Sequence, residues 1–384
     1  MLKSRGKKIK KSLHITHTDI LTDSRILKEM SALVKESYHV KGLGIELEEG
    51  AAETNLDFEA EIHAVRLVSR RLTYLPRTVR HVISLCELLL KMLPRALASK
   101  PDVVHCHDTL VLPIGVIVKL LSGAKLVYDA HELESDRNGL NYFQGLLTFW
   151  VETLLWRFVD ALIVVSPSIQ TWYFKNIGPK VSAVVLNTPL FEMPQFVNKN
   201  YLHERFGIPR EYLVFIYIGI LGKGRGLDLI IEVFSDPDIK SHVVFLGFGE
   251  YSDRLEKLAA VNQKFHLHKS VPHAKVVPIA MSADFGLCLV ENVSLSDYLC
   301  LPNKLFEYSF AGIPVLASNF PDIKDLIIKY KLGECCDLAV SDILNSVKEI
   351  ELTRPRYLFS NLDELNWQEQ ERVLLNLYRQ FDIC

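Results

Sequence analysis

A glycine-rich stretch with two cations, residues 219–226, has a composition suited to binding phosphate. It reads GILGKGRG, with Lys223 and Arg225 between the glycines, and it separates an apolar run from a helical pattern. Glycines let the backbone approach a ligand, and a helix N-terminus presents unpaired N–H groups with a partial positive charge. These features predict a diphosphate site. A flexible loop with two solvated cations remains the alternative, because the spacing is neither a P-loop nor GxGxxG.

A second stretch, LPNKLFEYSFAGIPVLAS at 301–318, places Lys304 and Glu307 one turn apart on a predicted short helix. Pro302 predicts the start of that helix and Gly312 its end. The lysine can face the same diphosphate, and the carboxylate can accept hydrogen bonds from both hydroxyls of a ribose. The stretch is therefore predicted to form one half of a nucleotide-diphosphate clamp, with the glycine-rich stretch as the other half.

Two apolar runs in the N-terminal half, DVVHCHD and LVYDAHE, end in polar clusters. They contribute the side chains of His105, His107, Asp108, Asp129, His131 and Glu132. Such groups can position a sugar or hold a metal ion, since His-x-His at a strand end is a known ligand pattern. Histidines satisfied by local hydrogen bonds are a third interpretation. Metal is disfavoured because no third cluster in this half completes a site.

The elements that must position these groups alternate between short β-rich runs and longer helical periods. This alternation predicts parallel sheets covered on both faces. Strands are expected at 12–17, 39–45, 102–107, 125–131, 161–166 and 182–187, then at 212–219, 242–249, 265–271, 283–290 and 313–318. The helices expected include 23–37, 112–123 and 364–381. A break at 188–201 predicts two doubly wound α/β domains, with the active site in the cleft between them.

The composition is that of a globular protein with more than one domain. The chain has 384 residues, of which 49% are hydrophobic and 23% charged, and its net charge of −2 gives no case for nucleic-acid binding. Seven cysteines without CxxC spacing predict reduced thiols in a cytoplasm. The basic start of the chain lacks a following apolar run and predicts no signal peptide. The most apolar stretch, 146–166, contains three charges and is interpreted as a helix followed by a strand.

Residues 66–100 form a basic segment in which eight lysines and arginines face a single acid, Glu87. Leucines and aromatic residues are interleaved with the charges. A basic amphipathic segment can lie on an anionic membrane surface. A solvated helix face is the alternative.

These stretches, together with DSRILKEMSAL at 23–33 and a C-terminal W…LY helix, resemble the retaining glycosyltransferases of the GT-B fold, family 4 type. The likeness covers nearly the whole chain, in the same order. It implies two Rossmann-like domains, 1–190 for the acceptor and 191–364 for the donor, facing a cleft. A helix at 365–384 is implied to return to the first domain.

The resemblance also implies an activity. It is the metal-independent transfer of a hexose from a nucleoside diphosphate, UDP more than GDP, to a glycan or lipid-linked acceptor with retention of configuration. No cofactor is implied. No carboxylate in the matched motifs is placed as a nucleophile, which favours front-face attack. The basic segment suggests a cell-surface polysaccharide intermediate as the acceptor, and a cytoplasmic enzyme at the inner face of the plasma membrane.

Individual roles follow by motif match. The catalytic residues implied are His131, Arg225 and Lys304. The donor-binding residues implied are Gly219, Gly222, Lys223, Gly224, Arg225, Gly247, Val271, Pro272, Asn303, Lys304, Leu305 and Glu307. The acceptor-binding residues expected are Asp23, Arg25, His107, Asp108 and Glu132. No metal ligand is assigned.

Two positions depart from the family pattern. Leu299 stands where a second carboxylate is common, and Ile220 where an arginine is common. The candidates to replace these groups are Lys223, Lys304, Glu291, Ser296, Asp297 and Tyr298. Three other functions therefore stay open: a nucleotide-sugar epimerase, a metal-dependent hydrolase using His105, His107 and His131, and a catalytically silent scaffold that binds a partner transferase.

Overall fold

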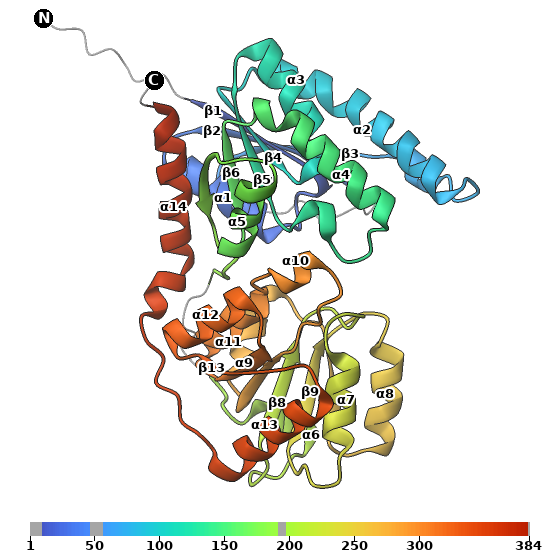
Figure 1. Ribbon diagram of the computed structural model, residues 1–384, viewed down its shortest axis with the longest axis vertical. Helices are drawn as coiled ribbons and strands as arrows, with labels where there is room; N and C mark the ends of the chain where they lie inside the picture. Colours follow the sequence, from blue (N-terminus) through green and yellow to red (C-terminus); the bar gives the residue numbers. More distant parts are fainter. Residues whose placement is uncertain (1–9, 47–56, 191–196, 383–384) are drawn as a thin grey trace, which may run out of the picture. The chain divides into compact units, whose positions relative to one another are not determined.

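The computed structural model describes residues 10–46, 57–190 and 197–382. The chain divides into two compact units: the first is coloured from blue to green in Figure 1 and also includes the red C-terminal residues, and the second contains the residues between. Unit 1 comprises Met1–Val185 and Glu371–Cys384, and unit 2 comprises Leu186–Gln370. The predicted break at 188–201 falls partly on residues 191–196, which lie outside the described residues.

Unit 1 is built on a seven-stranded parallel sheet with the order β3-β2-β1-β4-β5-β6-β7. The strands are β1 (Lys11–Asp19), β2 (His39–Ile45), β3 (Glu61–Val65), β4 (Val103–His107), β5 (Lys125–Ala130), β6 (Ala161–Val164) and β7 (Val181–Val184). The strands predicted for this half are confirmed, and β3 was not predicted. In the sheet register, His14 pairs with His105 and His107 pairs with Asp129. The sheet therefore gathers polar side chains of β1, β4 and β5.

The helices of unit 1 connect these parallel strands. They are α1 (Ser24–Lys35), α2 (Arg77–Ala98), α3 (Leu112–Ser122), α4 (Tyr142–Leu155) and α5 (Pro167–Asn176), with the 3-10 turns η1 (Val68–Arg71), η2 (Thr109–Val111), η3 (Glu134–Asp136) and η4 (Trp156–Phe158). Asp23 caps α1, because its carboxylate accepts from the N–H groups of Arg25 and Ile26. Within α14 (Trp367–Arg379), the residues from Glu371 onward belong to unit 1.

Unit 2 has a six-stranded parallel sheet with the order β10-β9-β8-β11-β12-β13. Its strands are β8 (Val214–Ile218), β9 (His242–Gly247), β10 (Phe265–Lys269), β11 (Phe285–Cys288), β12 (Val315–Ser318) and β13 (Gly333–Cys336). Its helices are α6 (Tyr201–Phe206), α7 (Leu227–Ser235), α8 (Ser252–Val261), α9 (Val276–Ala280), α10 (Leu295–Tyr298), α11 (Asn303–Ala311), α12 (Pro321–Tyr330) and α13 (Val340–Thr353). Because both sheets are parallel and have helical crossovers, the two predicted doubly wound α/β units are confirmed.

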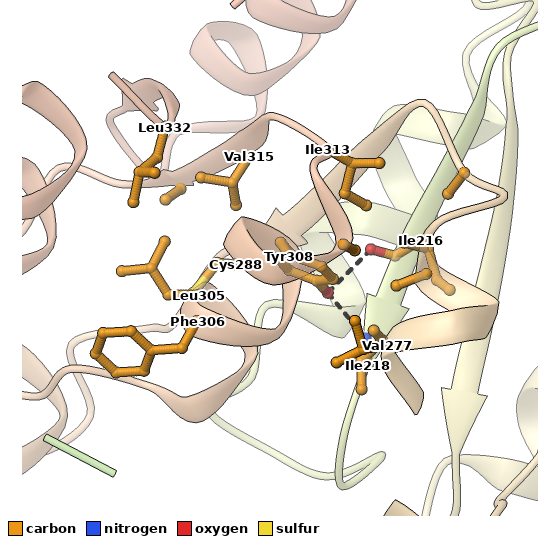
Figure 2. Close-up of a cluster of buried hydrophobic side chains, with 14 of the residues drawn as sticks. Ile216, Ile218, Val277, Cys288, Leu305, Phe306, Tyr308, Ile313, Val315 and Leu332 are labelled. Atoms are coloured by element: carbon orange, nitrogen blue, oxygen red, sulfur yellow. Dashed lines mark hydrogen bonds between the residues drawn. The ribbon is translucent and has the colours of Figure 1, made fainter. Parts of the chain in front are cut away.

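Helix α11 is fixed to the sheet of unit 2 by Tyr308, which lies in the core shown in Figure 2. The Tyr308 hydroxyl accepts from the N–H of Ile218 and donates to the carbonyl of Ile216, both at 3.0 Å. Gly286 leaves room for the ring, since a Cβ there would lie 2.4 Å from it. These contacts hold the first turn of α11, with Lys304, near the carboxyl end of β8.

The predicted boundaries of α11 are also confirmed. Pro302 is its N-cap, and Gly312 ends it in the left-handed region at φ 70°. Nowhere in the described ranges is there a helix long and apolar enough to cross a membrane.

Candidate functional site

The glycine-rich loop after β8 makes backbone approaches that a side chain would block. A Cβ on Gly226, which has φ 73°, would lie 2.1 Å from the carbonyl oxygen of Leu289. A Cβ on Gly247, at the end of β9, would lie 1.9 Å from the carbonyl oxygen of Gly219. Glycine is therefore required at these positions for the loop to lie against the ends of β9 and β11.

Carboxylates on neighbouring segments hold the loop in place. Glu291 accepts from the N–H of Gly226 at 2.9 Å, and Glu250 accepts from the N–H of Lys223 at 3.0 Å. Asp297, on α10, lies 3.5 Å from the Arg225 guanidinium and accepts from Ser294 Oγ at 2.8 Å. Glu291 and Asp297 are two of the candidates to replace the carboxylate that is absent at Leu299, and both contact the glycine-rich loop.

The structure brings Lys304 to the carboxyl end of β8. Its Nζ lies 3.7 Å from the centroid of the Tyr217 ring, a cation–π contact. A Cβ built on Gly219 would lie 3.8 Å from the same nitrogen. Arg225 is 33% exposed, so its guanidinium remains open to solvent on one side. Lys304 therefore lies beside the glycine-rich loop of unit 2, which also carries Arg225.

The other predicted donor residues divide into two groups. Glu307 is 7% exposed, and its carboxylate lies 3.5 Å from Nε2 of His273, directly after Val271 and Pro272. The predicted base and ribose segments are therefore neighbours. Leu305 differs, because its side chain is buried in the core and its N–H bonds the carbonyl of Pro302. The Leu305 side chain therefore packs in the core, and its role at the donor site stays a prediction.

In unit 1, strands β1, β4 and β5 bring four histidines together. His14 Nδ1 lies 3.0 Å from His107 Nε2, and His107 Nδ1 lies 3.1 Å from His131 Nε2. The ring of His105 stacks on His107 with 4.4 Å between centroids, and its Nδ1 lies 2.7 Å from the Tyr378 hydroxyl. The expectation that no third cluster joins the two predicted ones was wrong, because β1 supplies His14.

Asp129 is the buried anion of this cluster. It accepts from Arg25 Nε at 3.2 Å and Nη2 at 3.0 Å, and from His131 Nε2 at 3.1 Å. Arg25 also donates to the carbonyl of Val185 at 2.8 Å and lies 3.2 Å from Glu29. Only 2% of the Arg25 side chain is exposed, and its role at the acceptor stays a prediction. Arg25 is the counter-ion of Asp129.

The protonation states within the cluster follow from burial and charge. Burial lowers the pKa of His131, but the Asp129 and Asp108 carboxylates outweigh it and raise this pKa to about 10. Burial, with the nearby His105, lowers the pKa of His107 to about 3. Burial and the Asp129 charge raise the pKa of Glu29 to about 8. At neutral pH the cluster therefore holds a charged His131, a neutral His107 and a protonated Glu29.

His131 should make the free energy of unfolding fall as the pH rises. Its pKa is about 6.5 in an unfolded chain and about 10 in the folded one, so the folded state binds more protons between these values. The stabilisation is complete below pH 6.5 and is lost as the pH passes through about 10. We expect a shallower alkaline fall of Tm for His131→Gln by calorimetry, while the exposed-site control His63→Gln keeps the wild-type slope. Equal slopes in all three proteins would contradict this.

Two groups of side chains have the spacing of metal ligands. They are His14, Glu29, His105 and His107, and the trio His107, Asp129 and His131. In the trio the ligand atoms are 3.1–3.3 Å apart. However, Asp129 already carries the Arg25 guanidinium, a fixed positive charge beside any bound ion. The charged His131 must also lose its proton before it can ligate. The cluster is thus better suited to a buried ion-pair network than to a metal.

Asp108 follows β4 directly and lies at the edge of the histidine cluster. Its backbone has φ 68°, in the left-handed region that is costly for a residue other than glycine. Its carboxylate lies 3.7 Å from His17 Nδ1 and 3.9 Å from His131 Nδ1. Glu132, the next residue after His131, is exposed. Four residues of the cluster were not predicted from the sequence: His14, His17, Glu29 and Tyr378.

Two family models match this chain in sequence order. Residues 24–188 match the glycosyl transferase 4-like domain, and residues 198–357 match glycosyl transferases group 1. The chain belongs to the family 4-like glycosyltransferases of the GT-B fold. The first model covers the histidine cluster of this glycosyltransferase from Arg25 to His131, and the second covers Arg225, Lys304 and Glu307.

Relatives of this glycosyltransferase agree with that assignment. The chitobiosyldiphosphodolichol beta-mannosyltransferase of Kluyveromyces lactis is 22% identical over 349 residues, which cover 80% of this chain and 75% of the relative. Among solved structures, sucrose-phosphate synthase from Thermosynechococcus elongatus is similar with a TM-score of 0.76 at 16% identity, covering 97% of this chain and 99% of the other. Anabaena HepE in complex with UDP gives 0.70 at 13% identity, covering 97% and 98%. These structures show the GT-B fold.

Proposed function

We propose that this glycosyltransferase moves a hexose from a nucleoside diphosphate, UDP in preference to GDP, to a lipid-linked or polysaccharide acceptor with retention of configuration. The observation that carries the proposal is the position of Lys304 against Gly219, in the loop that carries Arg225. The two cations would neutralise the leaving diphosphate without a metal. Glu307, one turn after Lys304, would accept hydrogen bonds from the ribose hydroxyls.

The proposed reaction proceeds by front-face attack. The bond between the anomeric carbon and the diphosphate breaks, the acceptor oxygen bonds that carbon on the same face, and the acceptor proton passes to the leaving phosphate. The carboxylates nearest His131 support this route, because Asp129 is paired with Arg25 and Asp108 lies between two histidines. His131, held in its charged form, would donate a hydrogen bond to the donor sugar.

The acceptor part of the proposal rests on the Kluyveromyces relative, whose name describes a lipid-diphosphate-linked sugar. The preference for UDP is supported by the HepE complex. Action at the inner face of the plasma membrane, in cell-surface polysaccharide synthesis, remains part of the proposal. Release of UDP only when acceptor is present, with the anomeric configuration of the product followed by NMR, would separate transfer from epimerisation.

Glu307→Ala should weaken nucleotide binding without unfolding unit 2. At a hundredfold its Kd, UDP should raise the stability of the wild type by about 2.7 kcal/mol without added metal, and the variant should show a much smaller shift. The measurement is thermal denaturation with a panel of nucleoside diphosphates. Glu256→Ala, an exposed carboxylate on α8, is the matched control and should keep the full shift. Equal shifts in the two variants would remove Glu307 from the site.

A further inference from the structure

Helix α4 of unit 1 presents apolar side chains to solvent and its only carboxylate to the interior. Six large side chains on α4 are between 38% and 87% exposed: Tyr142, Phe143, Leu146, Leu147, Trp150 and Leu154. Their spacing of three and four residues places them along one face. A surface helix of a globular protein has the opposite arrangement, with its charges outward.

The outward face of α4 is fixed by a buried polar anchor. Glu152 is fully buried and accepts from the hydroxyls of Tyr128 and Tyr173, both at 2.6 Å, and of Thr109 at 3.2 Å. Burial raises the pKa of Glu152 to about 7, although these hydrogen bonds oppose the shift. Rotating α4 to hide its apolar face would break this anchor. The exposed face is therefore built into the fold.

A second group of exposed apolar side chains lies on α2. Helix α3 packs against both α2 and α4, and the three are neighbours in Figure 1. On α2 the exposed large apolar side chains are Val79, Val82, Ile83, Leu85 and Leu90. Within the described chain, most large hydrophobic side chains that remain exposed lie in residues 68–154. Concentrations of this kind mark interaction surfaces. We call these exposed side chains of α2 and α4 the α2–α4 surface.

Basic side chains border the α2–α4 surface. Arg66 and Lys91 are neutralised by Glu46 and Glu87. For Arg70, on η1, and Arg80, on α2, no ion pair is found among the described residues. Arg157 follows α4 in η4 and is exposed. The border thus retains positive charge that pairs within unit 1 do not cancel.

The basic border also adjoins the histidine cluster. The pKa of His17 is lowered by burial, and the charges of both Arg70 and Arg137 contribute to that shift. His17 in turn lies 3.7 Å from Asp108. A molecule held at Arg70 would therefore lie close to His17.

We propose that the α2–α4 surface binds an anionic glycerophospholipid bilayer, with the apolar side chains of α4 among the acyl chains and with Arg70 and Arg80 at the lipid phosphates. This proposal adds a membrane-binding surface to the proposed function. It rests on the proposed function only for the statement that the bound membrane presents a lipid-linked acceptor beside His17. Tyr142 and Trp150 suit such an interface, because their rings are apolar with one polar group. Negative lipid headgroups attract the basic border.

A second copy of the chain is the competing occupant. A two-fold interface through this surface would bring the same residues of both copies together, including the basic border. Like charges across an interface are unfavourable. The charge of the border therefore favours anionic lipid over a second copy.

The test is flotation of the full chain with vesicles of phosphatidylglycerol and phosphatidylcholine. Phe143→Ser with Trp150→Ser should reduce the bound fraction at least about tenfold. The control variant is Val261→Ser with Ile328→Ser, which replaces two exposed apolar residues of unit 2 and should bind like the wild type. Arg70→Ser with Arg80→Ser should lower binding about 25-fold on anionic vesicles, since each basic residue contributes about 1 kcal/mol. It should leave binding to neutral vesicles unchanged.

These measurements distinguish a failure of the membrane proposal from a failure of the proposed transferase function. UDP-induced stabilisation should be equal in the wild type and the α4 variant, and only transfer to a vesicle-embedded acceptor should fall. If the α4 variant floats as well as the control, the surface does not bind membrane. If the wild type stays in the lipid-free fraction and forms a dimer that Phe143→Ser with Trp150→Ser dissociates, the occupant is a second copy and the proposal is overturned.

Discussion

Replacing Asp129 by asparagine is expected to lower the free energy of unfolding by about 3–5 kcal/mol. The substitution removes the carboxylate that accepts from both Nε and Nη2 of the buried Arg25, whereas Glu29 approaches only Nε, at 3.2 Å. The pKa of His131 should fall as well, because Asp129 is the larger of the two charges that raise it. Urea denaturation gives the first quantity, and NMR titration of the His131 ring gives the second.

A matched control separates burial from charge removal. Asp238 also pairs with a cation, Lys348, but it is 73% exposed. Asp238→Asn should therefore leave the free energy of unfolding close to that of the wild type. Combining Asp129→Asn with Arg25→Met should recover part of the loss, because no unpaired charge then remains. If Asp129→Asn and Asp238→Asn are equally stable, the ion pair does not hold this cluster together.

Gly247→Ala is expected to abolish stabilisation by UDP. The added Cβ would meet the carbonyl oxygen of Gly219 at 1.9 Å, so the backbone at the end of β8 must move. That movement displaces the loop from Lys304 and costs about 1–3 kcal/mol of stability, as overpacking does elsewhere. Differential scanning calorimetry with and without UDP measures both effects.

Gly222→Ala is the control from the same loop. A Cβ at Gly222 has its nearest neighbours at 3.6 and 3.9 Å, an ordinary contact, and no positive φ is recorded there. Its stability without UDP should match that of the wild type. If Gly247→Ala retains the UDP shift, the nucleotide does not depend on the geometry of this loop.

Sequence periodicity predicted both sheets because parallel strands buried on two faces form continuous apolar runs. It missed β3, EIHAV, which is short and alternates exposed and half-buried residues at the sheet edge. It also missed β13, GECC, whose glycine and glutamate give little strand signal. Both are edge strands, where the neighbouring strand, rather than local pattern, determines the pairing.

The histidine cluster could be predicted only in part. DVVHCHD and LVYDAHE showed polar groups at strand ends, but His14 was treated only as part of a strand. The register that pairs His14 with His105 depends on β1 lying beside β4, which is a property of sheet order. Arg25 was assigned to the acceptor from its place in the family pattern. Nothing local shows that helix α1 buries its guanidinium against a strand 104 residues further along.

The candidate nucleotide site was more predictable because its signals are local. Glycines, cations and a helix start occur within a few residues of one another at 219–226, and a proline, a lysine and a glutamate occur within one helical segment at 302–307. The sequence could not show that Leu305 points into the core. It also could not show that Glu291 bonds the loop backbone, because this contact joins residues 65 positions apart.

The bond between His105 and Tyr378 joins residues 273 positions apart, with all of unit 2 between them in the sequence. Domains generally fold as units, from the N-terminus onward, as the chain is synthesised. Here unit 2 can be complete on the ribosome while unit 1 still lacks Glu371–Cys384. Until residues 371–384 are synthesised, His105 lacks its hydrogen-bond partner Tyr378. The apolar side of α14 is also not yet present to cover the residues around His105. Deleting residues from 371 onward should therefore damage the unit synthesised first, while leaving the one synthesised second intact.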